Sequence, residues 1–166
     1  MEVTRILDLI HFSGVRGRFI DLAFKNSSRV ENEQTPDGLG GISVFETTCA
    51  CPDRDGSCVC RHIARFYGSL VDDPYAFWTF DTAILQPPTG PDAVPTPALV
   101  KKASASGDDC HYNIHHVTPK RADAIRKAIP MGDVRLCING ASEGFSPARA
   151  TELQALRKSV KLALLD

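Results

Sequence analysis

Four cysteines form the densest group of chemically active residues in the chain. They make two Cys-x-Cys pairs on either side of the turn-forming sequence Pro-Asp-Arg-Asp-Gly, at Cys49, Cys51, Cys58 and Cys60. Four thiolates bind zinc tetrahedrally, and a turn between the pairs would bring the sulfur atoms together. Structural zinc sites usually space their ligands more widely than Cys-x-Cys. The cluster is therefore either a zinc site or a hairpin-like excursion whose cysteines pack as small apolar groups or oxidise after purification.

A second cluster lies at residues 110–116 and reads Cys-His-Tyr-Asn-Ile-His-His. If this stretch is a strand, His111 and Asn113 share one face and Tyr112 lies on the other. A cysteine beside a histidine is the pairing that thiol hydrolases use. Neighbouring residues on a strand point to opposite faces, however, so Cys110 and His111 are poorly placed to activate each other. The spacing thus disfavours a cysteine hydrolase.

Two glycines precede a short apolar stretch at residues 40–45, which reads Gly-Gly-Ile-Ser-Val-Phe. Glycine before a strand lets the backbone approach a ligand closely, and Ser43 would then offer a hydroxyl in a confined place. The alternative is a glycine turn that leads into a core strand. This pattern alone does not decide between the two.

The elements that must position these residues indicate a fold of the α+β class. Apolar runs predict strands at 18–24, 42–45, 77–80, 112–117 and 134–138, while 3–12 fits either a strand or a short helix. Helical spacing predicts a helix at 61–70, and start signals with proline predict helices at 121–129 and, over about 18 residues, from Pro147. The polar segment 26–41 and the proline-rich segment 86–97 are expected to be a loop and an extended connection.

The length of 166 residues fits one domain, and 43% of them are hydrophobic, enough for a substantial core. Nineteen basic and twenty acidic residues leave a net charge of −1, which argues against a nucleic-acid coat or a membrane-surface binder. No apolar run approaches the roughly 20 residues that span a bilayer, and the first residues lack a signal-peptide pattern. We therefore expect a cytoplasmic protein whose six cysteines are reduced thiols or metal ligands rather than a disulfide framework.

The order of several short motifs resembles a family of small bacterial toxins. These motifs are Gly-Ile-Ser-Val-Phe at 41–45 followed by Glu46, an aromatic stretch around Trp78, a proline-rich segment ending at 97–100, and His-Tyr-Asn-Ile at 111–114. The family includes a type VI secretion effector that acts in the cytosol, and it is similar in fold to mono-ADP-ribosyltransferases. The resemblance covers roughly residues 18–129. The chain departs from the family where Asn113 replaces a threonine and where a cysteine-rich insertion occupies about residues 47–62.

The resemblance implies one domain over residues 1–166, with two small mixed β-sheets around a cleft that holds NAD, and with flanking helices. Ser43 and His111 would line this cleft as catalytic residues. The catalytic carboxylate would be Glu143 or Glu46. The residues expected to bind NAD are Arg18, Gly41, Ile42, Ser43 and Tyr112, with Arg5 as the alternative to Arg18.

The function implied by the resemblance is that of a toxin that binds NAD and transfers ADP-ribose to an unknown target in a bacterial cytosol, either that of the producing cell or that of a recipient cell. A cognate immunity protein or antitoxin would restrain it. The transfer breaks the ribose–nicotinamide bond through an oxocarbenium-like state, so the site must orient NAD and stabilise positive charge. The alternative function is a non-catalytic binding module stapled by zinc at the cysteines between Cys49 and Cys60.

Overall fold

The computed structural model describes residues 1–20, 42–67, 74–85, 98–101, 107–115 and 119–163. The strands in these residues are β1 (Glu2–Leu7), β2 (Phe12–Ser13), β3 (Arg18–Phe19), β4 (Ile42–Glu46), β5 (Tyr75–Asp81), β6 (Ala98–Lys101), β7 (His111–His115), β8 (Arg135–Ile138) and β9 (Ala141–Gly144). The α-helices are α1 (Thr47–Ala50), α2 (Gly56–Phe66), α3 (Pro119–Ala128) and α4 (Pro147–Ala163), and the short 3₁₀ helices are η1 (Leu9–His11), η4 (Thr82–Leu85) and η5 (Met131–Asp133).

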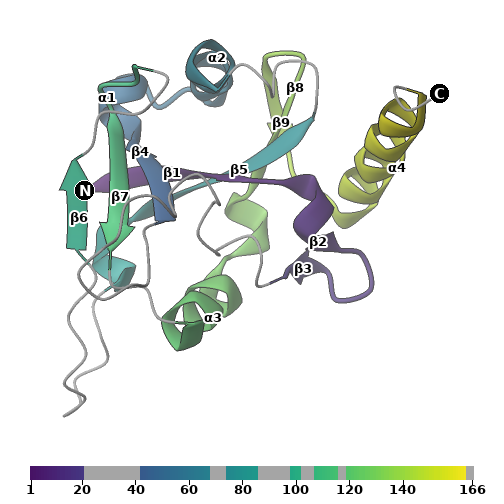
Figure 1. The fold of residues 1–166 in the computed structure, drawn as a ribbon, viewed down its shortest axis with the longest axis horizontal. Coiled ribbons are helices and arrows are strands. Elements are labelled where there is room, and N and C mark those ends of the chain that lie inside the picture. Colours follow the sequence, from purple (N-terminus) through teal and green to yellow (C-terminus); the bar gives the residue numbers. More distant parts are fainter. Residues whose placement is uncertain (21–41, 68–73, 86–97, 102–106, 116–118, 164–166) are drawn as a thin grey trace.

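Seven of the strands form one sheet in the order β6-β7-β4-β1-β5-β8-β9, and β2 and β3 form a separate two-stranded sheet (Figure 1). Every described strand pair is antiparallel. The α+β class predicted from the sequence is therefore confirmed. The expectation of two small mixed sheets is wrong for the described residues, because the strands join into one large antiparallel sheet and one small hairpin.

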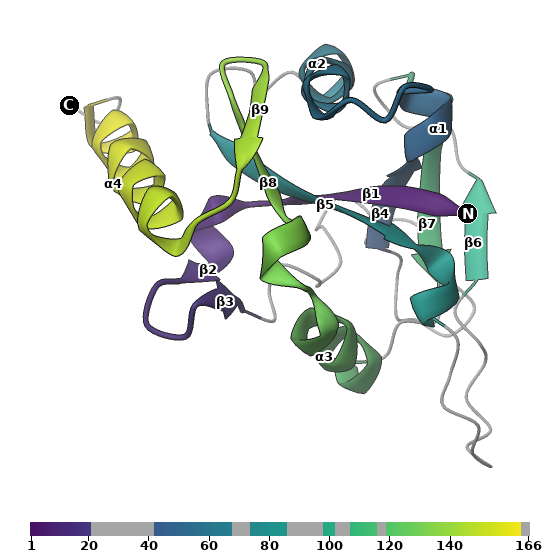
Figure 2. The same ribbon diagram turned by 180° about the vertical axis from the view of Figure 1, so that it is seen from behind.

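Helices cover both faces of the large sheet. Helices α1 and α2 lie over one face and α3 over the other, while α4 packs beside η1 (Figures 1 and 2). Because alternate residues of a strand point to opposite faces, each face has its own apolar cluster. On β5, Trp78 and Phe80 belong to the larger cluster, whereas Tyr75 and Phe77 belong to the cluster beneath α2. None of the helices in the described part of the chain is both long and apolar enough to cross a membrane.

The sheet changes direction between β1 and β4. Strand β1 pairs with β5 along its whole length, yet it pairs with β4 at only two positions, Val3 with Glu46 and Thr4 with Phe45. Beyond that point β4, β7 and β6 turn steeply away from β1 and β5 (Figure 1). We call this place, where the β1–β4 pairing ends, the β1–β4 divergence. It separates the sheet into a part with β6, β7 and β4 and a part with β1, β5, β8 and β9.

Most of the predicted elements are present with shifted limits. Strands are found at the predicted 77–80, 112–117 and 134–138 segments, and helices begin at Pro119 and Pro147 as their start signals indicate. The ambiguous 3–12 segment divides into β1, η1 and the start of β2. The predicted strand at 18–24 is a strand only at 18–19, and residues 21–24 lie outside the described residues. The segments 26–41 and 86–97 also lie outside them.

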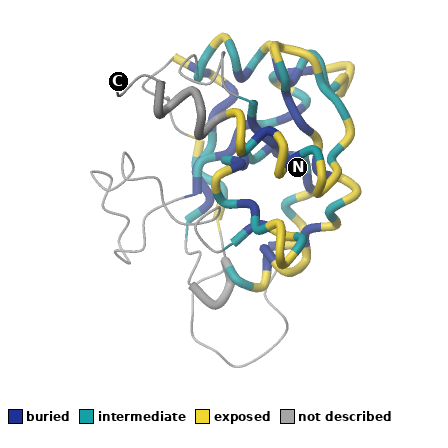
Figure 3. Tube along the Cα trace, turned by 90° about the vertical axis from the view of Figure 1, so that its right-hand side faces the viewer, coloured by how far each residue is buried: buried dark blue, intermediate teal, exposed yellow. Residues whose placement is uncertain are grey.

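Helix α2 begins five residues earlier than the predicted start at Arg61. Its first turn is capped by Asp55, whose Oδ1 accepts a hydrogen bond from the backbone N of Ser57 at 3.1 Å. An N-cap carboxylate satisfies a backbone donor that the helix itself leaves unpaired. The turn that was expected to separate the Cys-x-Cys pairs therefore leads directly into a helix, which carries Cys58 and Cys60. Figure 3 shows that buried segments are concentrated in the middle of the molecule and exposed ones at its outer turns.

The start of α2 predicts the effect of one substitution. A Cβ added to Gly56 would lie 2.5 Å from Ser142 Oγ and 2.9 Å from Ser142 Cβ on β9. Since relief requires a shift of α2 or β9, we expect Gly56→Ala to lower the free energy of unfolding by about 1–3 kcal/mol. Urea denaturation measures the change. Gly132→Ala is the matched control, because a Cβ there meets nothing within 4 Å; equal stability of the two variants would contradict this packing.

Candidate functional site

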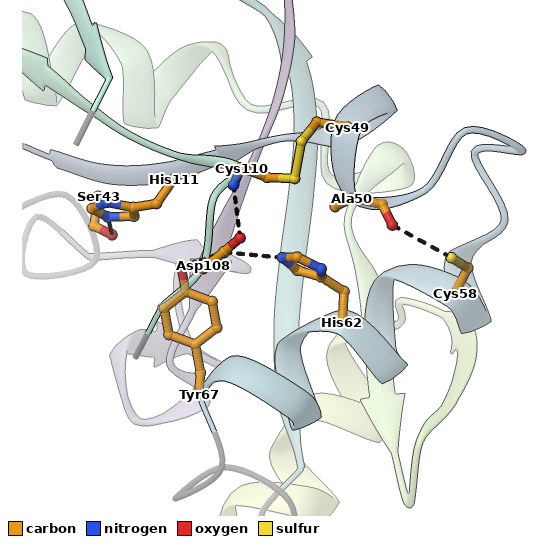
Figure 4. A network of polar contacts seen from close by, with 9 residues as sticks. All are labelled: Ser43, Cys49, Ala50, Cys58, His62, Tyr67, Asp108, Cys110 and His111. Atoms are coloured by element: carbon orange, nitrogen blue, oxygen red, sulfur yellow. Dashed lines mark hydrogen bonds and ion pairs between the residues drawn. A yellow bond between two sulfur atoms is a disulfide. The ribbon is translucent and has the colours of Figure 1, made fainter. Parts of the chain in front are cut away.

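A short hydrogen bond joins Ser43 and His111, the two residues that the sequence predicted to work together. Ser43 lies on β4 and His111 on β7, and the distance between Ser43 Oγ and His111 Nε2 is 2.7 Å (Figure 4). The register pairs Ser43 with Asn113 and Phe45 with His111, so the two side chains are diagonal neighbours on one face. His111 is buried and Ser43 is half-buried. The pair is therefore held by two adjacent strands rather than by a loop.

Arg5 contacts the backbone of one member of this pair. Its Nη1 donates a hydrogen bond of 2.7 Å to the backbone O of Ser43. The contact is formed at the β1–β4 divergence, where β1 no longer pairs with β4. Burial lowers the pKa of the Arg5 guanidinium to about 10, so at neutral pH it still carries a positive charge. The site thus combines a hydroxyl, an imidazole and a cation.

Arg18 and Glu143 do not join the site. Arg18, the predicted phosphate-binding residue, is exposed on β3 of the separate two-stranded sheet, and Arg5 takes the place beside Ser43. Glu143 lies on β9, which three strands separate from β4. At about 4.8 Å per strand, that order corresponds to roughly 19 Å. Glu143 instead forms an ion pair with Arg149, with 3.3 Å between Oε1 and Nη2.

The remaining residues predicted to bind NAD or to supply the carboxylate are not in contact with the Ser43–His111 pair where the structure describes them. Ile42 is a buried core residue, which packs in the larger apolar cluster. Tyr112 lies next to His111 on β7 and so points to the opposite face, where its OH donates to Glu46 Oε2 at 3.5 Å. Glu46 is thereby placed with Tyr112 rather than with the Ser43–His111 pair. Gly41 lies outside the described residues.

Beside the Ser43–His111 pair is a buried acidic residue, Asp108, in the turn before β7 (Figure 4). Its Oδ2 accepts hydrogen bonds from His62 Nε2 at 2.9 Å and from Tyr67 OH at 3.0 Å. Its Oδ1 accepts one from the backbone N of Cys110 at 2.9 Å. Burial alone would raise the pKa of Asp108, but these hydrogen bonds and the attraction of His62 outweigh it, and the pKa lies below its ordinary value. Burial, together with the charge and hydrogen bond of the same carboxylate, raises the pKa of Tyr67.

All six cysteines are joined in disulfides, and none is free. The pairs are Cys49–Cys110, Cys51–Cys58 and Cys60–Cys137. Of the two alternatives for Cys49, Cys51, Cys58 and Cys60, zinc ligation does not fit these disulfides, because a sulfur bonded to another sulfur is not a thiolate ligand. No group of three or more His, Cys, Asp or Glu among the described residues is arranged to hold a metal ion. The disfavoured cysteine hydrolase is excluded for the same reason, since Cys110 has no thiol.

The disulfides attach the α1–α2 segment to both sides of the β1–β4 divergence. Cys49 of α1 is bonded to Cys110, the residue before His111, at the start of β7. Cys60 of α2 is bonded to Cys137 of β8, in the other part of the sheet. The segment therefore spans the two parts covalently. This arrangement restricts how far β7 and β8 can move relative to each other.

The structure adds residues that the sequence did not single out. Sequence reasoning assigned no role to Asp108, Tyr67 or His62. A signal for Asp108 was present, since Gly107 and two aspartates come directly before Cys110, the residue that precedes the His-Tyr-Asn-Ile motif, and favour a turn there. No local pattern connects Asp108 with Tyr67, because 41 residues separate them.

No protein-family model, curated protein or solved structure matches this chain. What the arrangement offers is a hydroxyl and an imidazole in hydrogen-bond contact, next to a guanidinium that is held by the backbone of the same serine. Such a group of donors can orient a polyhydroxylated, negatively charged ligand.

The disulfides predict an order of stabilities. The sulfur-bonded residues are 7 positions apart in Cys51–Cys58 and 77 apart in Cys60–Cys137. Because a longer closed loop restricts the unfolded chain more, we expect a loss of about 2.5 kcal/mol when the first pair is changed to serine and about 4.5 kcal/mol for the second. Urea denaturation of the two double variants measures these values.

Thiol titration in denaturant provides the control for this experiment. Unreduced wild-type protein should show no reactive thiol, and reduced protein should show six. Six reactive thiols before reduction, in protein that is folded and stable, would contradict the disulfide pairing.

Proposed function

We propose that this chain is a toxin of the ADP-ribosyltransferase type, which binds NAD at Arg5, Ser43 and His111. The observation that supports the proposal is the 2.7 Å hydrogen bond between Ser43 and His111, with Arg5 bonded to the same serine. The motif order of the sequence also points to Ser43 and His111. The β1–β4 divergence lies beside these residues, where the single large sheet changes direction.

The chemistry of NAD cleavage suits these three side chains. The ribose–nicotinamide bond breaks through an oxocarbenium-like state, and catalysis depends on holding the ribose in the reactive geometry. Ser43 and His111 supply donors and acceptors for ribose hydroxyls. The Arg5 guanidinium supplies positive charge for the pyrophosphate. Glu46 accepts a hydrogen bond from Tyr112, and Asp108 accepts hydrogen bonds from His62 and Tyr67. We therefore assign NAD binding to this site and assign no carboxylate to the transfer step.

The disulfides bear on where such a toxin is made. Disulfides form and persist in oxidising compartments and are rare in reducing cytosols. Three of them favour assembly in an oxidising compartment over the cytoplasmic folding that the sequence suggested. NAD is a cytosolic substrate, so the proposed toxin is exported in its oxidised form and acts after entry into a recipient's cytosol. A cognate immunity protein or antitoxin and an unknown target molecule complete this proposal.

The first test is NAD binding by the oxidised protein, measured by isothermal titration calorimetry. We expect Ser43→Ala, His111→Ala and Arg5→Lys each to weaken binding by about tenfold or more, because a hydrogen bond to a charged ligand contributes roughly 1.5–3 kcal/mol. Arg18→Lys and Glu143→Gln are the matched controls and should bind as the wild type does. Wild-type protein that is folded, oxidised and unable to bind millimolar NAD would refute the proposal.

The second test is growth of bacteria that express the chain in the cytosol. In a strain whose cytosol permits disulfide formation, the wild type should arrest growth and His111→Ala at equal abundance should not. In an ordinary strain with a reducing cytosol, we expect weaker growth arrest, because the Cys49–Cys110 disulfide that restrains the start of β7 does not form there. Equal toxicity of the wild type and His111→Ala would exclude this site as the cause.

A further inference from the structure

Asp108 is unusual among the acidic residues near the site because it is 1% exposed, while its neighbour Asp109 is exposed. A carboxylate is costly to bury unless hydrogen bonds replace its contacts with water. Three donors supply that replacement here: His62 Nε2, Tyr67 OH and the backbone N of Cys110. Because burying this carboxylate costs free energy and takes several hydrogen-bond donors, we looked for a structural role of Asp108.

An ordinary turn accounts for only part of this arrangement. Asp108 Oδ1 accepts from Cys110 N, and the backbone O of Asp108 accepts from His111 N at 3.3 Å, as in many turns that begin a strand. A turn of that kind needs neither the second carboxylate oxygen nor burial. Oδ2 instead reaches His62, in the second half of α2, and Tyr67, the residue directly after the helix, which lie 46 and 41 residues away in sequence. The carboxylate therefore joins the turn to the helix.

The same end of α2 also contacts the strand that carries Ser43. The rings of His62 and Phe45 lie 4.8 Å apart, and those of Tyr67 and Phe45 lie 6.5 Å apart. Phe45 is the cross-strand partner of His111 and is two residues from Ser43. In addition, the backbone N of Glu46 donates to the backbone O of Cys110 at 2.8 Å. Both strands of the Ser43–His111 pair are thus fixed against α2 (Figure 4).

We propose that Asp108 is a positioning residue, which holds His111 in its hydrogen bond with Ser43 by tying the turn before β7 to His62 of α2 and to Tyr67, the residue that caps the C-terminus of this helix. What the positioned pair binds rests on the proposed function above. The positioning itself is a property of the ligand-free protein and is testable without NAD. Asp108 stays ionised at neutral pH, because its hydrogen bonds keep its pKa below the ordinary value despite burial, and an ionised carboxylate accepts from all three donors.

The test compares Asp108→Asn with Asp109→Asn, its exposed neighbour in the same turn. The readouts are the imidazole ¹⁵N chemical shifts of His111 by NMR, NAD affinity and the free energy of unfolding at several pH values. For Asp108→Asn we expect shifted His111 signals and about tenfold weaker NAD binding. For Asp109→Asn we expect neither. Tyr67→Phe, which removes one donor and leaves the carboxylate, should give a smaller change in the same direction.

The pH dependence has a definite sign. Because the pKa of Asp108 is lowered in the folded state, its ionised form adds stability above the pKa of the unfolded chain. The excess stability of the wild type over Asp108→Asn should be complete at neutral pH and disappear as the pH falls through the lowered pKa.

Each outcome decides a separate point. Unchanged His111 signals in a less stable Asp108→Asn variant would overturn the positioning role and leave a structural one. Shifted His111 signals in a protein whose wild type fails to bind NAD would support positioning and refute the proposed function. If Asp108→Asn does not fold, Tyr67→Phe decides, and His111 signals identical to the wild type in that variant would overturn the proposal.

Discussion

The arrangement of the site depends on where the hydrogen-bond ladder between β1 and β4 ends. After Thr4 and Phe45 the two strands part, so no backbone N–H of β1 pairs with the carbonyl of Ser43, and this carbonyl needs a side-chain donor. Arg5 supplies that donor from the next residue of β1. A half-buried backbone group left without a partner would cost free energy, which is why the guanidinium is held there. A backbone requirement thus fixes a positive charge beside the Ser43–His111 pair.

Two kinds of cross-link hold the region around this point. The disulfides attach the α1–α2 segment to β7 on one side of the divergence and to β8 on the other. The polar link runs through Asp108, which joins α2 to the turn that begins β7. Covalent bonds restrict the unfolded chain, whereas the buried carboxylate demands one geometry of its partners. Helix α2 and the two strands of the site therefore behave as one unit.

The sequence predicted much of the fold and a smaller share of the site. Apolar patterning located β5, β7 and β8, and start signals located α3 and α4. The apolar spacing misplaced the start of α2, because the Asp55 cap determines where this helix begins. In the site, motif order named Ser43 and His111, which the structure places in contact. It preferred Arg18 over Arg5, because position along a strand does not reveal which sheet that strand joins.

The sequence by itself determined where most of the described strands and helices lie, because these follow from local periodicity and helix start signals. The tertiary structure alone decided which distant residues meet. The cysteines that looked like one local metal cluster find partners 61 and 77 residues away in two of three cases. The Asp108–His62 contact depends likewise on how α2 lies across the sheet. Such pairings are set by strand order and register over the whole chain, which no local pattern encodes.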